Sequence, residues 1–424
     1  MHPRVAQLTV SAWLILVAEG VAAQDWLETR IAIEELVEAG RLDAAVELEP
    51  LLFERVAETY GQSSTELADA HLFMARVHAR NADFVTVEGL IFDAIDIYEL
   101  VRGANAVELF EPYMALGDHY LALGDNELAI NAYSEARSVS RRHFGLLNLE
   151  QLEVLDRLTT VAIAMRDGDE ARDLQHDKLD LVMRAYGEDS LQYLDANFAY
   201  ADWLNRFPTS GRVLPQYAAI ERLIKRNFDD DPRIHIRYLR YRAAGMRRFI
   251  APQNFHLRPA FLEQALDWVE ELEQSTGQPD PLLHAEVLLD LGDWYVWFRQ
   301  TDEIAAAYTQ AWELLGAVDD GADIREQWFG QSRLLGTMPA LRSRAITNAA
   351  SSRAGRIEVE FTVKPDGTTA DAVLVDADPT GFLENDALAI VGFIRVRPRI
   401  VDGSVVEFTD NIIWNFNYDP DAIR

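Results

Sequence analysis

The chain of 424 residues contains no cysteine, and it has only 15 prolines. Without cysteine there is no disulfide framework, no thiol catalysis and no lipoprotein attachment site, so stability must come from packing. Basic residues are also few, with 39 Lys and Arg against 70 Asp and Glu and a net charge of −31 at pH 7. This balance argues against a nucleic-acid binder and favours partners that present basic patches.

Long hydrophobic runs are missing as well. The longest one, from Leu8 to Ala18, follows Arg4 and precedes small residues that end at Ala23. As a helix it would span about 16 Å, whereas the hydrocarbon core of a bilayer is roughly 30 Å thick. The pattern predicts a secretory signal over residues 1–23, cleaved before Gln24, and export to a bacterial periplasm. The alternative is an uncleaved segment that anchors the chain at the inner membrane.

Catalytic motifs are absent too. The sequence has no Gly-x-Ser-x-Gly elbow, no His-Glu-x-x-His, no phosphate-binding glycine loop and no dinucleotide fingerprint. His71 and His78 lie seven residues apart, but no carboxylate or cysteine pattern completes a metal site. We therefore expect no catalytic residues, no metal, no cofactor and no small-molecule substrate.

What the sequence does contain is a repeat. Tyr60-Gly61, Phe144-Gly145 and Tyr186-Gly187 resemble one another, and Gly103 falls on the same 42-residue spacing. The next step reaches Phe228-Asp229. Fourteen residues after each point comes a small residue, which allows two helices to approach closely. These residues are Ala75, Gly117, Thr159, Ala201 and Ala243.

Two segments give the repeat most clearly. One contains Gly117 and then Tyr133, and the other contains Gly292 and then Tyr308. Over roughly residues 26–315 the pattern resembles tetratricopeptide repeats (TPR), in the longer variant of kinesin light chains. The resemblance implies a superhelix of paired helices with a concave face that binds peptides or protein surfaces.

Nine basic residues lie between Arg222 and Arg248. With Ala243 at a helix contact, Arg237, Arg240 and Arg247 share one helix face. In the TPR family this face lines the groove, where the planar fork of arginine would grip the carboxylates of an acidic peptide. In the alternative interpretation these arginines pair with acidic residues of the same protein.

The pattern changes after Gly321. Residues 319–337 are expected to be a linker, and alternation of Ile357, Val359, Phe361 and Val363 with polar residues then predicts a strand. Lys364-Pro-Asp-Gly367 suits a hairpin turn. A second strand over 369–375, a helix after 381 and a last strand ending at Tyr418 complete a strand–strand–helix–strand unit.

This unit resembles the TonB carboxy-terminal domain. The resemblance rests on Gly355, the Asp366-Gly367 turn, Ala387-Leu388 and the segment Phe393–Pro398. The chain departs from the family in having Val396 where an aromatic is usual, and in having only Met338-Pro339 upstream instead of a tyrosine–proline pair.

The TonB resemblance implies a domain that adds a partner's extended segment to the edge of its sheet. The candidate edge is Val405–Tyr418, with Ile412, Ile413, Asn415 and Asn417 as contact residues. Arg395 and Arg397 are the candidate charged flank. Alternatively, these arginines face solvent, and Trp414 by itself is best interpreted as core.

The expected fold is therefore mostly α: a TPR-like superhelix over residues 24–318, then a small TonB-type α+β domain over 338–424. Two functions fit. The first is a periplasmic adaptor that binds envelope proteins, among them an outer-membrane receptor segment. The second is a TonB-type component that transduces energy to outer-membrane receptors from an inner-membrane anchor.

Overall fold

The structure is a computed structural model that describes residues 26–207, 213–249, 257–336, 340–347 and 352–423. The predicted signal segment, 1–23, lies outside these residues. The chain divides into two compact units, Met1–Val213 and Leu214–Arg424. None of the helices in the described ranges is both long and apolar enough to cross a bilayer.

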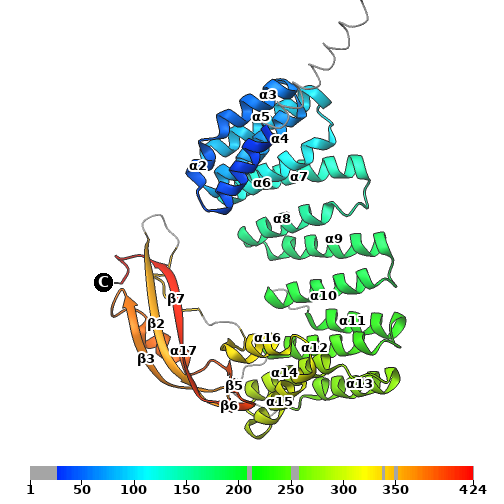
Figure 1. Ribbon diagram of the computed structural model, residues 1–424, viewed down its shortest axis with the longest axis vertical. Helices are drawn as coiled ribbons and strands as arrows, with labels where there is room; N and C mark the ends of the chain where they lie inside the picture. Colours follow the sequence, from blue (N-terminus) through cyan, green and yellow to red (C-terminus); the bar gives the residue numbers. More distant parts are fainter. Residues whose placement is uncertain (1–25, 208–212, 250–256, 337–339, 348–351, 424) are drawn as a thin grey trace, which may run out of the picture. The chain divides into compact units, whose positions relative to one another are not determined.

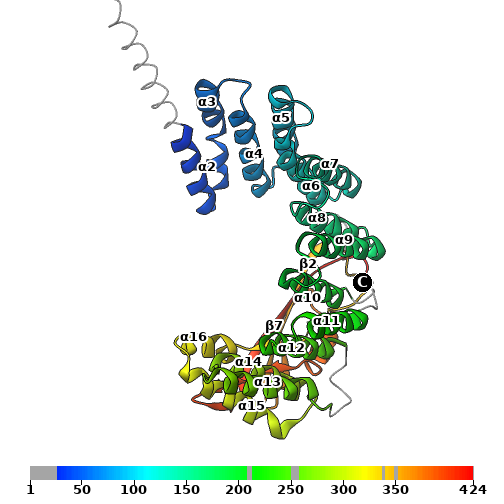
Figure 2. The same ribbon diagram turned by 90° about the vertical axis from the view of Figure 1, so that its right-hand side faces the viewer.

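The first unit consists of antiparallel helices stacked in pairs (Figures 1 and 2). Residues 26–38 are helical. The helices that follow are α2 (Leu42–Val46), α3 (Glu49–Tyr60), α4 (Thr65–Arg80), α5 (Phe84–Arg102), α6 (Phe110–Leu123), α7 (Asn126–Phe144), α8 (Gln151–Ala164), α9 (Gly168–Tyr186) and α10 (Leu191–Arg206).

The 42-residue period comes from the ends of the second helices of the pairs. Gly61, Gly103, Gly145 and Gly187 directly follow α3, α5, α7 and α9, with φ of 99°, 90°, 87° and 93°. Each glycine N–H donates to the carbonyl four residues earlier and so caps the helix. Glycine reaches this backbone conformation without the steric cost of a Cβ. The repeat predicted from the sequence is confirmed.

Small residues lie at the helix contacts, as predicted. Ala75, Thr159 and Ala201 are all buried in the first unit. Gly117 is the extreme case, because a Cβ there would come within 2.4 Å of Cε1 of the buried Tyr133 ring. The ring therefore fills the space that the missing side chain leaves, and the helices α6 and α7 can approach closely.

The second unit begins with further helix pairs. They are formed by α11 (Val213–Asn227), α12 (Pro232–Phe249), α13 (Ala260–Thr276), α14 (Pro281–Trp297) and α15 (Thr301–Leu314). Gly292 of α14 lies against Tyr308 of α15 just as Gly117 lies against Tyr133, and a Cβ added at Gly292 would come within 2.3 Å of Cε1 of Tyr308. The helices α14 and α15 therefore form a full TPR-like pair.

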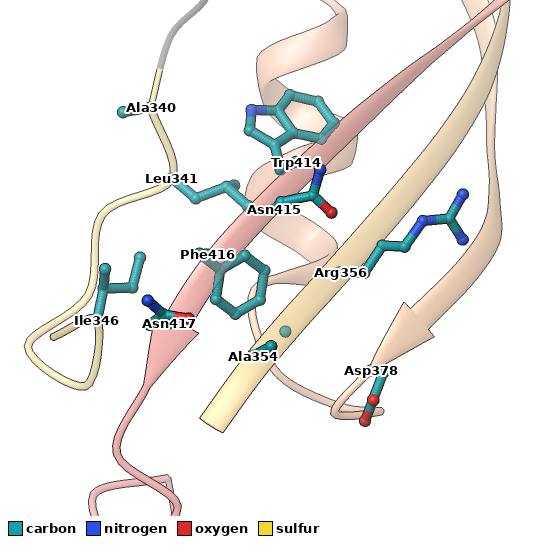
Figure 3. Close-up of a pocket in the computed structure, with 11 residues that line it drawn as sticks. Ala340, Leu341, Ile346, Ala354, Arg356, Asp378, Trp414, Asn415, Phe416 and Asn417 are labelled. Carbon is teal, nitrogen blue, oxygen red and sulfur yellow. The ribbon is translucent and has the colours of Figure 1, made fainter. Parts of the chain in front are cut away.

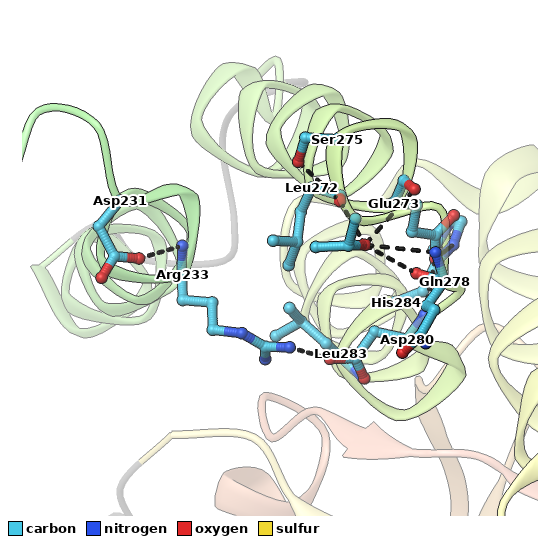
Figure 4. Close-up of polar contacts among 10 residues, drawn as sticks. Asp231, Arg233, Leu272, Glu273, Ser275, Gln278, Asp280, Leu283 and His284 are labelled. Atoms are coloured by element: carbon cyan, nitrogen blue, oxygen red, sulfur yellow. Dashed lines mark hydrogen bonds and ion pairs between the residues drawn. The ribbon is translucent and has the colours of Figure 1, made fainter.

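Polar contacts join the helix starts in this unit (Figure 4). Asp231 accepts from the backbone N–H of Arg233 at 3.0 Å, and the Arg233 guanidinium pairs with Asp280 at 2.7 Å. Asp280 also caps α14 by accepting from the N–H of Leu283 at 3.1 Å. The acidic run that begins at Asp229 thus contributes a helix cap at the start of α12.

The stretch expected to be a linker, 319–337, contains ordered elements. It holds α16 (Gly321–Arg325), the π-helical turn η4 (Glu326–Gly330) and β1 (Arg333–Leu334). Phe329 and Leu335 are buried in the same core as α14 and α15. Because large apolar side chains leave water here, these residues pack on the last helices instead of separating two domains.

The predicted strand–strand–helix–strand unit is present. It consists of β2 (Arg353–Val363), β3 (Thr369–Asp378), α17 (Glu384–Val391) and β7 (Phe408–Tyr418), in the antiparallel order β3-β2-β7. Between α17 and β7 lie three short strands, β4 (Val396–Arg397), β5 (Arg399–Val401) and β6 (Ser404–Val406). The last predicted strand therefore starts later than expected, at Phe408.

The core of this unit lies between the sheet and α17. Ile357, Val359 and Phe361 of β2 are buried against Ala387 and Val391 of α17. At about 1.5–3 kcal/mol for each large apolar side chain, this burial accounts for the alternation seen in the sequence. The hairpin between β2 and β3 turns at Gly367, with φ of 73°.

Replacing Gly117 by alanine is expected to destabilise the protein by about 1–3 kcal/mol, since the added methyl group overlaps the Tyr133 ring. Gly89 in α5 is the matched control because a Cβ there meets nothing within 4 Å. Gly89→Ala should be neutral or stabilising by up to about 1 kcal/mol. Urea unfolding of both variants measures the difference, and equal unfolding midpoints would contradict the assignment of Gly117 to a helix contact.

Candidate partner-binding strand edge

The sheet has two edges, and β7 forms one of them, because β2 lies in the middle. The carbonyl of Asn417 accepts from the N–H of Thr347 at 3.0 Å and therefore points away from β2. Backbone direction alternates along a strand, so the N–H and C=O groups of Asn411, Ile413 and Asn415 point the same way. Within the described ranges these outward groups have no backbone partner.

The predicted edge residues divide between the two faces of β7. Ile413 is 42% exposed, and Asn415 and Asn417 are exposed on the same outer face. Ile412 lies on the opposite face and packs partly against the core. Trp414 is buried there as well, which agrees with its interpretation as core. The structure thus brings Ile413, Asn415 and Asn417 together at one edge, and it places Ile412 behind them.

Part of the edge is already covered by the chain itself. We call residues 340–347 the strap. Its Ile346 forms an isolated antiparallel bridge with Tyr418, and the N–H of Asp419 donates to the carbonyl of Ala345 at 2.8 Å. The strap therefore occupies the end of the edge at residues 417–419 and leaves the stretch Asn411–Asn415 uncovered by described residues.

A cavity of about 740 Å³ lies between the strap and this end of the sheet. Figure 3 shows Leu341 and Ile346 on the strap side, with Phe416 and Asn417 on β7. Gly355 of β2 also lines it, and a Cβ at that residue would lie 2.5 Å from Cε2 of Phe416. The glycine therefore gives the Phe416 ring its place over β2, which explains the glycine of the family motif.

Arg395 and Arg397, the arginines expected to flank the edge, are buried instead. Arg397 is only 2% exposed, and its Nε and Nη2 donate to the two carboxylate oxygens of Asp293 in α14, both at 2.8 Å. Arg395 is also buried. Arg397 is therefore inside the unit, because a bidentate acidic partner lies on α14, whereas Nη1 of Arg395 donates to the Ile394 carbonyl at 2.8 Å.

Asp293 is the centre of a buried polar cluster. The hydroxyl of Tyr308 donates to it at 2.9 Å, and Arg247 of α12 lies 3.1 Å away. Burial alone would raise the pKa of Asp293, but the charges of Arg397 and Arg247 and the hydrogen bonds from Arg397 and Tyr308 lower it to about 2. Burial in turn favours neutral arginine, yet Asp293 raises the pKa of Arg397 above its ordinary value. The pair is therefore ionised.

A similar constellation occurs in the first unit. Asp118 follows Gly117 and accepts from the Tyr133 hydroxyl at 2.6 Å and from Nε of Arg157 at 2.7 Å. Arg157 belongs to α8, the first helix of the next pair. At Asp293 the arginine comes from β4 instead. The short strand β4, which pairs with β1, thus makes the contact that the next helix pair would otherwise make.

The predicted groove arginines Arg240 and Arg247 also have acidic partners in the chain. Arg240 pairs with Asp290 at 2.6 Å and with Glu286, both on α14, and Arg247 lies against Asp293. Arg237 is exposed on α12. The arrangement favours the alternative interpretation for Arg240 and Arg247, in which arginines of one helix pair hold the next.

Metal ligands do not gather in the part of the chain that the structure describes: no group of three or more His, Asp or Glu side chains there could hold an ion. The arrangement offers backbone hydrogen bonds along β7 and apolar contact in the neighbouring cavity. This is chemistry suited to binding an extended peptide.

Asp293→Asn should cost about 3–5 kcal/mol of stability at pH 7, because it leaves Arg397 and Arg247 buried without a counter-charge. Asp118→Asn is the control: its side chain is 47% exposed against 5% for Asp293, so about 1 kcal/mol or less is expected. Urea unfolding measures both.

The ion pair of Asp293 and Arg397 also predicts that the stability of the fold depends on pH. The pKa of Asp293 is lowered from 3.8 to about 2 in the folded chain, so its stabilisation is complete above pH 3.8 and is lost as the pH falls through about 2. The difference in stability between the native chain and Asp293→Asn should shrink over that interval. A difference that stays constant would show that the carboxylate is not ionised in the fold.

Comparison with known proteins agrees with the division of the chain into helix pairs and a terminal domain that contains a β-sheet. Residues 348–418 match the family model described as Gram-negative bacterial TonB protein C-terminal. No curated protein is similar to the chain at a significant level.

Several solved structures resemble the helical part. A Podosopora anserina protein described as a kinesin light chain with nearly identical TPR-like repeats shares 13% identity, with a TM-score of 0.39, over 47% of this chain and 96% of its own. The apo form of RapI shares 8% identity, with a TM-score of 0.36, over 70% and 99%. BtubC from P. vanneervenii shares 16% identity, with a TM-score of 0.29, over 78% and 97%.

At these scores the similarities add nothing to what the helix pairs of the chain show by themselves. Residues 348–418 form a domain of the TonB C-terminal family, and TPR-like helix pairs precede it in the sequence.

Proposed function

We propose that this protein is a binding adaptor of the Gram-negative cell envelope, whose terminal domain accepts an extended segment of a partner as an additional strand on β7. The observation that carries the proposal is the row of outward backbone groups at Asn411, Ile413 and Asn415. Such groups form hydrogen bonds with any extended chain, and exposed side chains beside them supply specificity.

The partner is an envelope protein with an unfolded or extended segment, such as the periplasmic tail of an outer-membrane receptor. The segment would pair with Asn411–Asn415 and extend toward the cavity that Leu341, Ile346 and Phe416 line. An apolar side chain of the partner fits there, because much of the cavity wall is apolar.

The helix pairs supply a second binding surface in this proposal. Their concave face takes a peptide or a protein surface, with Arg237 as the most accessible of the predicted groove arginines. Arg240 and Arg247 act there only where a partner's carboxylates compete with Asp290 and Asp293. The domain limits proposed for the two activities are 24–318 and 338–424.

The TonB family match also favours a second candidate function, in which the chain transmits energy to outer-membrane receptors. The two functions share the strand-accepting edge. They differ in the fate of the first 23 residues, which an exported adaptor loses and an anchored transducer keeps.

The edge is tested with Ile413→Pro. Proline removes the outward N–H at this residue but leaves the hydrogen bonds to β2 intact, because edge strands tolerate proline on the solvent side. Capture of envelope proteins by the full chain should fall roughly fivefold, because the partner strand forfeits a backbone hydrogen bond that contributes about 1 kcal/mol. Ile413→Ala keeps the N–H and should retain most of the capture.

A photo-crosslinker at Asn415 locates the partner directly. It should form adducts in envelope extract whose yield falls with Ile413→Pro, whereas a crosslinker at Asp371 on β3 should form none. Equal capture by Ile413→Pro and the native chain, with adducts at both sites, would rule out strand addition at β7.

Sequencing the amino terminus of the protein isolated from its own cells separates the two functions. The adaptor should begin at Gln24, because small residues at Val21 and Ala23 suit signal cleavage. An intact Met1 in the membrane fraction would instead favour the transducer.

A further inference from the structure

The first unit contains a cavity of about 370 Å³ that is separate from the strand edge. Its wall comes from α4, α5, α6 and α8, which belong to three consecutive helix pairs. Small residues on neighbouring helices leave the space open, namely Ala75 and Ala79 on α4 and Ala115 and Ala122 on α6. An engineered apolar cavity of about 150 Å³ already holds a benzene ring. This cavity therefore has room for an aromatic ring with a polar substituent.

Much of the wall is apolar, and it contains two aromatic rings. Val87 of α5 and Met114 of α6 are buried and line the cavity. The rings of Phe84 and His119 lie there as well, with 6.3 Å between their centroids and 46° between their planes. Aromatic rings attract one another in offset and edge-to-face arrangements at such separations. The wall therefore favours an aromatic group over an aliphatic one.

His119 is the polar residue of the wall that lacks a partner. It is 5% exposed, and its Nδ1 is buried with no hydrogen-bond partner among the described residues. The neighbouring polar side chains are paired, Arg76 with Glu111 at 3.1 Å and Arg157 with Asp118 at 2.7 Å. A buried nitrogen without a partner costs free energy. A ligand that supplies the missing hydrogen bond regains it.

The charge of His119 decides which polar group fits. Burial lowers its pKa below the ordinary value, although Glu88 and Asp125 act in the opposite direction. The imidazole is therefore neutral at pH 7 and offers no charge to a carboxylate or a phosphate. A hydroxyl group both donates and accepts, so it can bond Nδ1 in either tautomer of the ring. An aromatic ring that carries a hydroxyl thus matches both parts of the wall.

A second cavity of about 300 Å³ lies next to the first, and Arg76 lines both. Its wall comes from α4 and from the helical residues 26–38, and it includes Phe73 and Val37. The Arg76 and Glu111 side chains are each 62% exposed and therefore accessible to the polar backbone of a ligand. Two adjacent cavities with polar side chains beside them suit a segment that carries several side chains, rather than a single free phenol.

We infer that the cavity between α4 and α6 binds the side chain of a tyrosine in an extended segment of a partner protein, with the phenol hydroxyl bonded to Nδ1 of His119. The ring packs beside Phe84 and Met114, and a neighbouring side chain of the segment enters the cavity at Phe73. The inference rests on the proposal that the helix pairs bind a partner, but it does not depend on the β7 edge.

Methyl NMR of the full chain tests the inference, because the chain has only seven methionines and Met114 lines the cavity. The Met114 signal is assigned with Met114→Leu. N-acetyl-alanyl-tyrosyl-alanine amide should shift this signal saturably, and it should bind roughly fivefold tighter than the phenylalanyl analogue, which lacks the hydroxyl. Free p-cresol is the third probe. A shift with p-cresol but none with the tyrosyl peptide would show a site for free phenols and would overturn the inference.

Three variants separate the contributions of the wall. His119→Phe should abolish the preference for the tyrosyl peptide, and Ala115→Phe should abolish binding of both peptides, because its ring fills the cavity. His176→Phe is the matched control: His176 lies on α9 outside the cavity with its side chain 59% exposed, so the fivefold preference should remain.

Two further results would overturn the inference. One is equal affinity for the two peptides, which would retain a binding surface on the helix pairs but exclude the bond to His119. The other is a preference for tyrosine that survives in His119→Phe. Since Ile413→Pro reports on β7 alone, a failure at this cavity is distinguishable from a failure of the strand edge.

Discussion

The buried pair of Arg397 and Asp293 is the interaction on which the second unit depends. Arg397 comes from β4, Asp293 comes from α14, and both oxygens of the carboxylate accept a hydrogen bond. Two buried charges are costly apart, so they keep β4, which pairs with β1, against the last helix pair. Further contacts follow from that position: Thr309 of α15 donates to the Gly403 carbonyl at 3.1 Å, and Ile400 of β5 lies in the core of α14 and α15.

The attachment of Arg397 uses a feature of the helix pairs themselves, the carboxylate that follows the glycine at the helix contact. In one helix pair the motif of glycine, aspartate and a tyrosine from the next helix presents a carboxylate to the arginine of the following pair, as Asp118 does to Arg157. In the last pair Asp293 presents the same group to Arg397. A helical array needs a cap where its last apolar face would meet water. The short strands β4 and β5 provide that cap, and the glycine and tyrosine beside Asp293 are the residues that let α14 and α15 approach closely.

Local pattern predicted most of the fold. Glycine spacing indicated the helix ends, and alternation along 357–363 indicated β2, because both depend on neighbours in the sequence. The contacts of Arg395 and Arg397 could not be predicted this way, since the acidic partner of Arg397 lies on a helix that is distant in the sequence. A signal existed in the likeness of Gly117-Asp118 and Gly292-Asp293, which marked Asp293 as a carboxylate in need of an arginine. The strap was also missed, because residues 345–347 carry no strand alternation and pair with Asn417 and Asp419 only through backbone groups.

Because β2 is the middle strand of the sheet, β7 is an edge whose backbone alternates between paired and open groups, and this alternation is the central claim. Residue-resolved hydrogen exchange of the full chain tests it most directly. The amides of Ile413 and Asn415 should exchange fast and those of Ile412 and Phe416 slowly, because only the latter two point to β2. Uniform protection along 411–416 would show that another part of the chain already covers the edge, and it would contradict the account.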